Sequence, residues 1–351
     1  MASDQRRGGR AQPHLKDARV PVSVPFLVVT DTVKNPARSS LCLIRWWFGE
    51  FPAHMDCILR SCAANPDIDW LILTDNRTPR KFPPNVRLHH TSLDELKKLF
   101  SARLGFAVNL PASHALHTFK PAFGFFFEEL VKNYDFWGYC DFDMIFGDLR
   151  KFLREDILAV HDKILCRGHL TLYRNSERVN HAFQLDCPGA LNYHDAFQAG
   201  EPRQFDEWRG INLIFRYHNL PQFHDEFIVD VTPPTSCKIK RFEGITIRNH
   251  PQQVFYWHKG KIFHAYLNAD RGIVDDEYAY IHFQRRFMPA PAFDPFAVDG
   301  FLITPDGFFP YRREPLSDAD FAKYNRERWQ PFAQLTRAAW RSLLWRLGFG
   351  S

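Results

Sequence analysis

The sequence predicts an α/β fold in which a mostly parallel sheet is flanked by helices and is followed by an irregular α+β half. Apolar runs of strand length alternate with segments of helical periodicity through the first half of the chain, which is typical of parallel sheets. Acidic residues follow directly after two of these runs. From about residue 180 the pattern becomes short and irregular, rich in His, Trp, Tyr and Pro. We therefore expect a single sheet with a ligand crevice at the carboxyl ends of its strands.

The individual elements follow from local patterns. Strands are predicted at 41–44, 69–74, 86–89, 136–140 and 163–166, and residues 168–173 are expected to extend the sheet on its far side. Helices are predicted at 55–64, 92–100 and 121–132. Ser92 and Glu95 form a capping box at the start of the second helix. Pro121 opens the third, because proline suits the first turn of a helix.

The composition of the protein argues against several classes of function. A net charge of +5 on 351 residues is too mild to indicate a nucleic-acid partner. The seven cysteines form no Cys-x-x-Cys pair, so neither a disulfide framework nor a zinc site is indicated, and a reducing compartment is expected. The sequence shows no signal-peptide core and no apolar run of membrane-spanning length. We expect a cytoplasmic protein, or one peripheral on the inner face of the membrane.

Changes in composition divide the chain into three regions. Residues 1–38 are expected to be a flexible basic leader, because they carry seven Lys and Arg against three Asp and show little periodicity. Residues 39–315 form the main domain. Residues 316–351 are predicted to be a basic amphipathic helical tail, with an apolar face of Phe332, Leu335, Ala339, Leu343 and Leu347. That face could lie on an anionic membrane or pack on the protein or a second subunit.

Asp141 and Asp143 are the leading candidate site residues, because they follow the apolar run 136–140. They are two apart in a chain that is leaving strand geometry, so both side chains can point the same way. Carboxylates suit Mg²⁺ or Mn²⁺, which bind one or two of them together with substrate phosphates. The alternative is a surface turn with two solvated acids. The apolar run before the pair favours the metal site.

A nucleotide site is expected beside the acidic pair. Asp75 follows the run 69–74, and the aromatic loop 46–51, which contains Phe48 and Gly49, follows the first strand. Loops after neighbouring strands of an open sheet converge, so these groups can hold a base and ribose while the metal holds a diphosphate. The sequence has neither a P-loop nor a Gly-x-Gly-x-x-Gly motif, so no glycine-rich loop of either kind is present to bind the phosphates instead.

Seven motifs between residues 40 and 290 carry a resemblance to a known family. They are Phe48-Gly49-x-Phe51-Pro52, Ile72-Leu73-Thr74-Asp75, Phe119-Lys120-Pro121-Ala122, the run from Asp135 to Asp148 that contains Phe-Trp-Gly-Tyr-Cys-Asp-x-Asp-x-Ile-Phe-Gly-Asp, Arg167 to Asn175, Phe205-Asp206-Glu207-Trp208, and His282-Phe283-Gln284-x-Arg286. With these motifs the chain resembles uncharacterised bacterial proteins that are regarded as glycosyltransferases of the A-type fold and occur in surface-polysaccharide contexts.

The resemblance implies a single Rossmann-like sheet, with a nucleotide-sugar half at 39–175 and an acceptor half at 176–315. It implies that His282 joins Asp141 and Asp143 at the metal, and that Arg286 on the same strand face binds phosphate. Lys120 is expected to meet the phosphates or the sugar at the start of the predicted helix, where the dipole is favourable. The alternatives are a strand with a polar outer face for His282 and a solvent-exposed side chain for Lys120.

Acceptor-binding residues are also implied. Trp208 offers an aromatic platform for a sugar face, and the adjoining Asp206 and Glu207 are candidates for the general base if the enzyme inverts configuration. His169 is expected to contact donor or acceptor, although a structural histidine is an alternative. The pair Asp225 and Glu226 is a weaker rival for the base.

The function expected from these residues is a metal-dependent glycosyltransferase. It would use Mn²⁺ or Mg²⁺ and a nucleotide-sugar donor, and would act on a glycan or lipid-linked acceptor in surface-polysaccharide synthesis. One alternative is a haloacid-dehalogenase-like phosphatase, but Ile145 stands where that class has Thr or Val and the motif lies far from the first strand. The other is a non-catalytic nucleotide-sugar or glycan-binding module, whose expected signature would be loss of the acidic pair.

Overall fold

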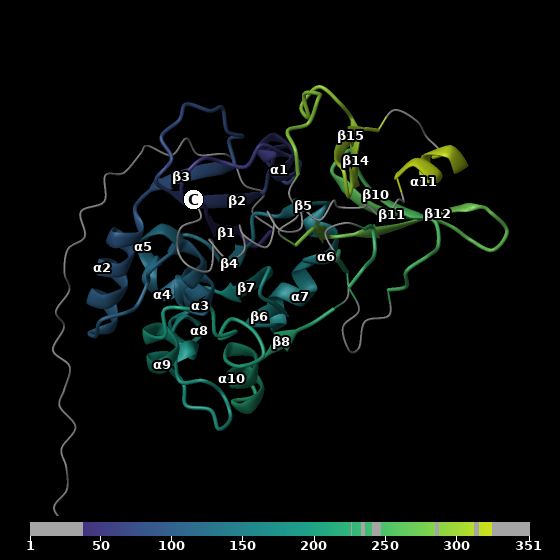
Figure 1. Cartoon of the computed structure of the whole chain (residues 1–351). Coiled ribbons are helices and arrows are strands. Elements are labelled where there is room, and N and C mark those ends of the chain that lie inside the picture. Colours follow the sequence, from purple (N-terminus) through teal and green to yellow (C-terminus); the bar gives the residue numbers. More distant parts are fainter. Residues whose placement is uncertain are drawn as a thin grey trace, which may run out of the picture. The chain divides into compact units, whose positions relative to one another are not determined.

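The computed structural model describes residues 38–225, 227–232, 236–240, 247–284, 288–311 and 316–324 (Figure 1). These residues belong to one compact unit of the chain, residues 36–351. The predicted leader, apart from Arg38, lies outside the described residues, and so does the predicted tail after residue 324.

Seven strands within the described residues form the main sheet, in the order β3-β2-β1-β4-β7-β6-β8. They are β1 (Leu41–Trp46), β2 (Ile68–Thr74), β3 (Val86–His90), β4 (Phe136–Cys140), β6 (Lys163–Arg167), β7 (Leu170–Arg174) and β8 (Gln222–Phe223). β3, β2, β1 and β4 run parallel to one another, and β7 is antiparallel to both β4 and β6. The predicted α/β fold with a mostly parallel, helix-flanked sheet is confirmed. The placement of 168–173 at the far side of the sheet is wrong, because β7 lies inside it, between β4 and β6.

Alternate residues of β1 pack on opposite faces of this sheet. Leu41 and Leu43 belong to one buried cluster with α1 (Met55–Ala63), whereas Cys42 and Ile44 belong to another with α2 (Leu93–Leu104). This is the two-residue period of a strand buried on both sides. The sheet is therefore covered by helices on both faces. Because both faces are buried, the candidate site residues lie at the ends of the strands.

Helix α2 begins as predicted, and the segment expected as a single helix at 121–132 does not form one. Ser92 accepts a hydrogen bond from the backbone of Glu95, and the Glu95 side chain accepts one from the backbone of Ser92, which completes the capping box. Instead, residues 113–131 form a series of short helices, which begins before the predicted segment. They are η1 (Ser113–Ala115), α3 (Leu116–Phe119), η2 (Lys120–Ala122), α4 (Phe123–Phe126) and α5 (Glu128–Val131). Its buried phenylalanines keep a helical spacing, so the periodicity indicated the buried face but not the interruptions.

The second half of the chain adds a sheet that the sequence pattern did not reveal. Five strands of the described part form it, in the order β12 (Ile273–Tyr278), β11 (Lys261–Leu267), β10 (Gln253–His258), β14 (Gly300–Thr304) and β15 (Gly307–Pro310), all antiparallel. The expectation of a single sheet is wrong for this reason. Both faces of β10 are buried between separate apolar clusters, one of which includes α11 (Asp318–Tyr324), so β10 lacks the alternation that marks a half-exposed strand.

A small third sheet joins distant parts of the sequence. Its order within the described residues is β5 (Met144–Phe146), β13 (Tyr280–His282) and β9 (Ile228–Asp230), with β13 antiparallel to β5 and parallel to β9. The registers align His282 with both Met144 and Asp230. This sheet brings the segment after Asp143 beside residues from much later in the chain.

The remaining short helices are α6 (Leu149–Phe152), α7 (Glu155–Val160), α8 (Glu177–Asn180), η3 (Ala182–Gln184), α9 (Tyr193–Gln198) and α10 (Ile211–Tyr217). Among the residues that the structure describes, no helix has the length and apolar character needed to cross a membrane.

Candidate metal centre

The expected nucleotide-site residues meet at one edge of the main sheet. β1, β2 and β4 are parallel, so the segments that follow them emerge at the same edge. The backbone N–H of Gly49, after β1, donates to Oδ1 of Asp75, after β2, over 2.7 Å. Asn76 donates to the carbonyl of Gly49 over 2.8 Å, and Phe48 is half-buried against the neighbouring apolar cluster. The loop and the carboxylate are thus held together, with Asp75 exposed.

The acidic pair lies at the same edge and meets a histidine from the end of β13. Nε2 of His282 lies 3.2 Å from Oδ1 of Asp143. One ligand atom from each of Asp141, Asp143 and His282 can be chosen so that all lie within 4.8 Å of one another. The side chains of Asp141 and Asp143 are 17% and 23% exposed, so both carboxylates can be reached from solvent. Two carboxylates and one imidazole fit Mn²⁺ or Mg²⁺.

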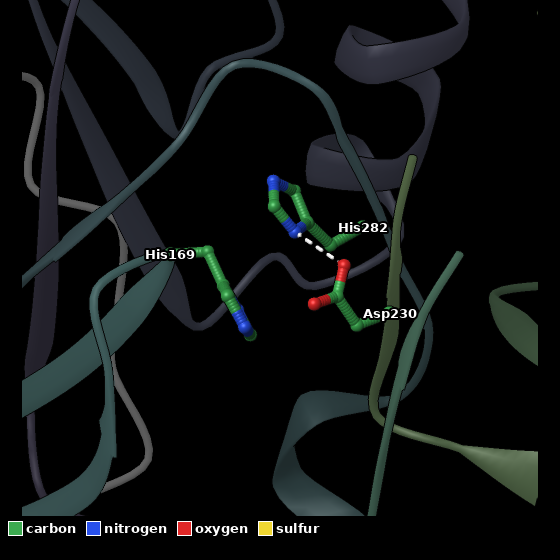
Figure 2. Close-up of side chains that lie close together, drawn as sticks. All are labelled: His169, Asp230 and His282. Atoms are coloured by element: carbon green, nitrogen blue, oxygen red, sulfur yellow. Dashed lines mark hydrogen bonds and ion pairs between the residues drawn. The ribbon is translucent and has the colours of Figure 1, made fainter. Parts of the chain in front are cut away.

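His282 lies between two carboxylates. Its Nδ1 donates to Oδ1 of Asp230 over 2.9 Å (Figure 2). On the other side of the ring, Nε2 faces Asp143. Burial alone would lower the pKa of His282, but the charges and hydrogen bonds of Asp143 and Asp230 outweigh it and raise the pKa to about 10. A cation bound at Nε2 would take the place of the proton on that nitrogen.

Lys120 is buried beside Asp141, and its expected contact with the phosphates or the sugar stays a prediction. Its Nζ donates to Oδ1 of Asp141 and to the carbonyl of Gly168, each over 2.7 Å, and lies 3.6 Å from Oδ2 of Asp206. Burial opposes the charge on Lys120, yet the two carboxylates raise its pKa. Likewise burial favours a protonated Asp141, but the ammonium group holds the pKa of that carboxyl below its usual range.

The expectations for Lys120 therefore need correction. It is fully buried, which excludes the solvent-exposed alternative. It lies in the 3-10 turn η2, so the predicted helix that would have directed a dipole at the phosphates does not begin there. Because Nζ already has two hydrogen-bond acceptors and a second carboxylate nearby, Lys120 is a bridge between protein groups.

The expected acceptor residues Asp206 and Glu207 adjoin the metal centre through Gly168. The backbone N–H of Gly168 donates to Oε1 of Glu207 over 2.6 Å. A Cβ at position 168 would lie 2.8 Å from both Oδ2 of Asp206 and Oε1 of Glu207, so the two carboxylates pack directly on the glycine. Burial raises the pKa of Asp206 to about 7 even though Lys120 opposes the shift.

Trp208 and Asp225 lie in more open surroundings. The Trp208 side chain is 46% exposed, and the guanidinium of Arg167 lies 5.7 Å from the centre of its ring. Asp225 is exposed, Glu226 lies outside the described residues, and Arg286 does too. The expected roles of Trp208 and Arg286 therefore stay predictions.

His169 lies against His282. Its ring stacks on that of His282, with centroids 4.6 Å apart and planes inclined by 24°. Nδ1 of His169 is 2.8 Å from the hydroxyl of Tyr280. Nε2 is buried and has no hydrogen-bond partner among the described residues. His169 is thus a neighbour of the candidate ligand His282, and its expected contact with donor or acceptor stays a prediction.

Two residues at the site were missed from the sequence. Arg45 is buried within β1, donates to the backbone carbonyl of Asp141 over 2.7 Å, and lies 3.8 Å from the ring centre of Phe142. The sequence signal for Arg45 was an arginine inside an otherwise apolar strand. Asp230 ends the apolar strand β9, and an acid at a strand end is the same signal that identified Asp141.

Fold and site together define an α/β protein with a carboxylate and imidazole cluster at the edge of a mostly parallel sheet. The chain belongs to DUF6625, a family of unknown function whose model matches residues 43–312. That match contains both aspartates of the pair and His282. No curated protein matches the chain.

Proposed function

We propose that the protein is a metal-dependent glycosyltransferase with an A-type fold, which moves a sugar from a nucleotide-sugar donor to a glycan or lipid-linked acceptor. The observation that carries the proposal is the grouping of Asp141, Asp143 and His282 within 4.8 Å at the carboxyl end of β4. In an open α/β sheet this edge is where ligands bind. The resemblance of the sequence motifs to uncharacterised bacterial proteins that are regarded as glycosyltransferases supports the same function and suggests a role in surface-polysaccharide synthesis.

The donor would lie across the ends of β2, β1 and β4. Asp141, Asp143 and Nε2 of His282 would hold Mn²⁺ or Mg²⁺, which supplies positive charge to the departing diphosphate. Asp75 is exposed and already fixed by the backbone of Gly49, so its other oxygen can accept a hydrogen bond from a ribose hydroxyl. The loop that contains Phe48 would border the base.

The acceptor would approach from the side of Asp206, Glu207 and Trp208. A general base works best when its pKa is near the working pH, and burial brings the pKa of Asp206 to about 7. Glu207 is engaged by the backbone of Gly168, which makes Asp206 the better candidate for accepting a proton. The exposed indole of Trp208 offers an apolar surface to a sugar ring.

A thermal-shift screen of the full chain tests the proposal. The protein would be heated with UDP-, GDP-, CMP- and dTDP-sugars, each with and without Mn²⁺, because a ligand that binds the native state raises the melting temperature. Stabilisation by one class of nucleotide only when Mn²⁺ is present is the expected result. Stabilisation by simple phosphate esters without any response to nucleotide sugars would favour a phosphatase and overturn the proposal.

A further inference from the structure

We propose that Asp230 is a positioning residue for the metal centre, which turns the imidazole of His282 so that Nε2 faces the cation and Nδ1 keeps its proton. The inference rests on the proposed function, because it presupposes a cation at Asp141, Asp143 and His282. It adds a residue from β9 that acts on the metal through His282.

The pairing of β9 with β13 places the two side chains together. The strands are parallel, and the register aligns Asp230 with His282, so both residues stand at corresponding positions. Nδ1 of His282 then reaches Oδ1 of Asp230 at 2.9 Å (Figure 2). The opposite ring nitrogen, Nε2, lies 3.2 Å from Oδ1 of Asp143. A single ring orientation satisfies both contacts.

Asp230 is itself held in place. Its carboxylate is 3% exposed and accepts hydrogen bonds from Nε2 of Gln284 at both oxygens, each over 2.7 Å. The backbone adds a contact from Lys240 to the carbonyl of Asp230 over 2.7 Å. A buried carboxylate is costly unless it is paired and hydrogen-bonded, and Gln284 and His282 together meet that need.

The expected effect follows from the chemistry of imidazole. A neutral ring binds a metal through one nitrogen, and the hydrogen bond made by the other nitrogen sets which one is available. A carboxylate in that outer position also makes the ligand more basic, and loss of such partners commonly lowers metal affinity by about 10- to 100-fold.

A rival arrangement would use His169, Asp230 and His282 as ligands themselves, since they also lie within 4.8 Å of one another and all three are buried. The ring geometry argues against it. The lone pair of an imidazole nitrogen lies in the ring plane, and the stacked planes of His169 and His282 are inclined by only 24°, so the lone pairs do not converge on one ion. The Asp143 side of His282 is also the more open one, with 23% of that carboxylate exposed.

Manganese titration of the full chain, followed by the electron paramagnetic resonance signal of free Mn²⁺, tests the proposal. The proteins compared are the wild type, Asp230→Asn, His282→Ala, the double variant, and Asp162→Asn as a matched control. Asp162 is another buried carboxylate, paired with Arg174 and Arg178 and not with His282. We expect Asp230→Asn to weaken Mn²⁺ binding about 10- to 100-fold, and Asp162→Asn to leave it unchanged.

The double variant separates positioning from general damage. If Asp230 acts through His282, then Asp230→Asn causes no further loss once His282 is alanine. Wild-type affinity in Asp230→Asn, or an equal loss in both backgrounds, would overturn the inference while the proposed function stood. A wild type that binds no Mn²⁺ would overturn both.

A measurement on the wild type covers the case in which Asp230→Asn does not fold. Protein labelled with ¹⁵N-histidine and loaded with Mg²⁺, which is diamagnetic, reports the protonation of each ring nitrogen of His282. We expect a proton on Nδ1 and none on Nε2. The opposite pattern would overturn the inference and favour the rival set of ligands that includes His169.

Discussion

The ammonium of Lys120 lies 2.7 Å from the carboxylate of Asp141, inside the protein, and 3.6 Å from that of Asp206. One buried cation therefore connects the candidate metal ligand to the candidate base. Two charges that are buried together lose their hydration, so their attraction and hydrogen bonds must compensate for that loss. The two halves of the proposed site thus depend on a residue that makes no contact with either substrate in our proposal.

Replacement of Lys120 should be strongly destabilising. In Lys120→Met the side-chain volume is nearly kept, but Asp141 and Asp206 are left without their shared cation, and breaking a buried pair costs about 3–5 kcal/mol. Urea unfolding of the two proteins measures the difference. The control is Lys132→Met, which removes an exposed surface pair with Glu129 and should change stability by less than about 1 kcal/mol. Equal stability of Lys120→Met and the wild type would contradict the buried bridge.

Removal of Asp143 should abolish metal-dependent donor binding and leave the fold intact. Asp143→Ala deletes a partly exposed carboxylate, so the packing of the core is little affected. The thermal shift that a nucleotide sugar gives with Mn²⁺ should disappear. Asp156→Asn, which alters an exposed ion pair with Arg154, should keep the full shift. A metal-dependent shift that persists in Asp143→Ala would exclude this carboxylate as a ligand.

Gly168 should tolerate no side chain. In Gly168→Ala the new Cβ would lie 2.8 Å from carboxylate oxygens of Asp206 and Glu207, which must then move away. Overpacking of this kind typically costs about 1–3 kcal/mol, measurable by chemical unfolding. The comparison is Gly272→Ala, where the nearest atoms belong to an exposed Asn268 side chain at 3.3 Å. An equally small effect at both positions would show that the two acids do not pack on Gly168.

Lys163 should make stability depend on pH in the alkaline range. Burial lowers its pKa to about 7 in the native state, where Nζ donates to the carbonyl of Leu165, against about 10.4 in an unfolded chain. Between these values the unfolded state binds more protons, so the free energy of unfolding rises with pH, by at most about 1.4 kcal/mol per unit. Lys163→Met should lack this rise. Parallel stability curves for the two proteins between pH 7 and about 10 would contradict a neutral buried lysine.

The sequence predicted those features that depend on one strand and its end. Asp75 and Asp141 each follow an apolar run, and the parallel pairing of β2, β1 and β4 brings the two strand ends to one edge as expected. The capping box of α2 was equally local, since both partners lie within one turn. These predictions needed no knowledge of which distant segments pair.

The features that were missed depend on pairing across long stretches of chain. Asp230 meets His282 only because β9 pairs with β13, and nothing near either residue specifies that pairing. The position of β7 inside the sheet depends on an antiparallel contact with β4, which apolar content alone does not distinguish from an edge position. The five-stranded sheet was not predicted because β10 is buried on both faces and so shows no period of two.

The small sheet of β5, β13 and β9 has a consequence for the order in which the protein is made. Asp141 and Asp143 leave the ribosome early, but the strand that bears His282 is synthesised much later and pairs with β5 only then. A growing chain that ended before β13 would carry both aspartates without the imidazole. In our proposal, full affinity for a cation is therefore acquired only after β13 has been synthesised, when the described strands of the main sheet have already been made.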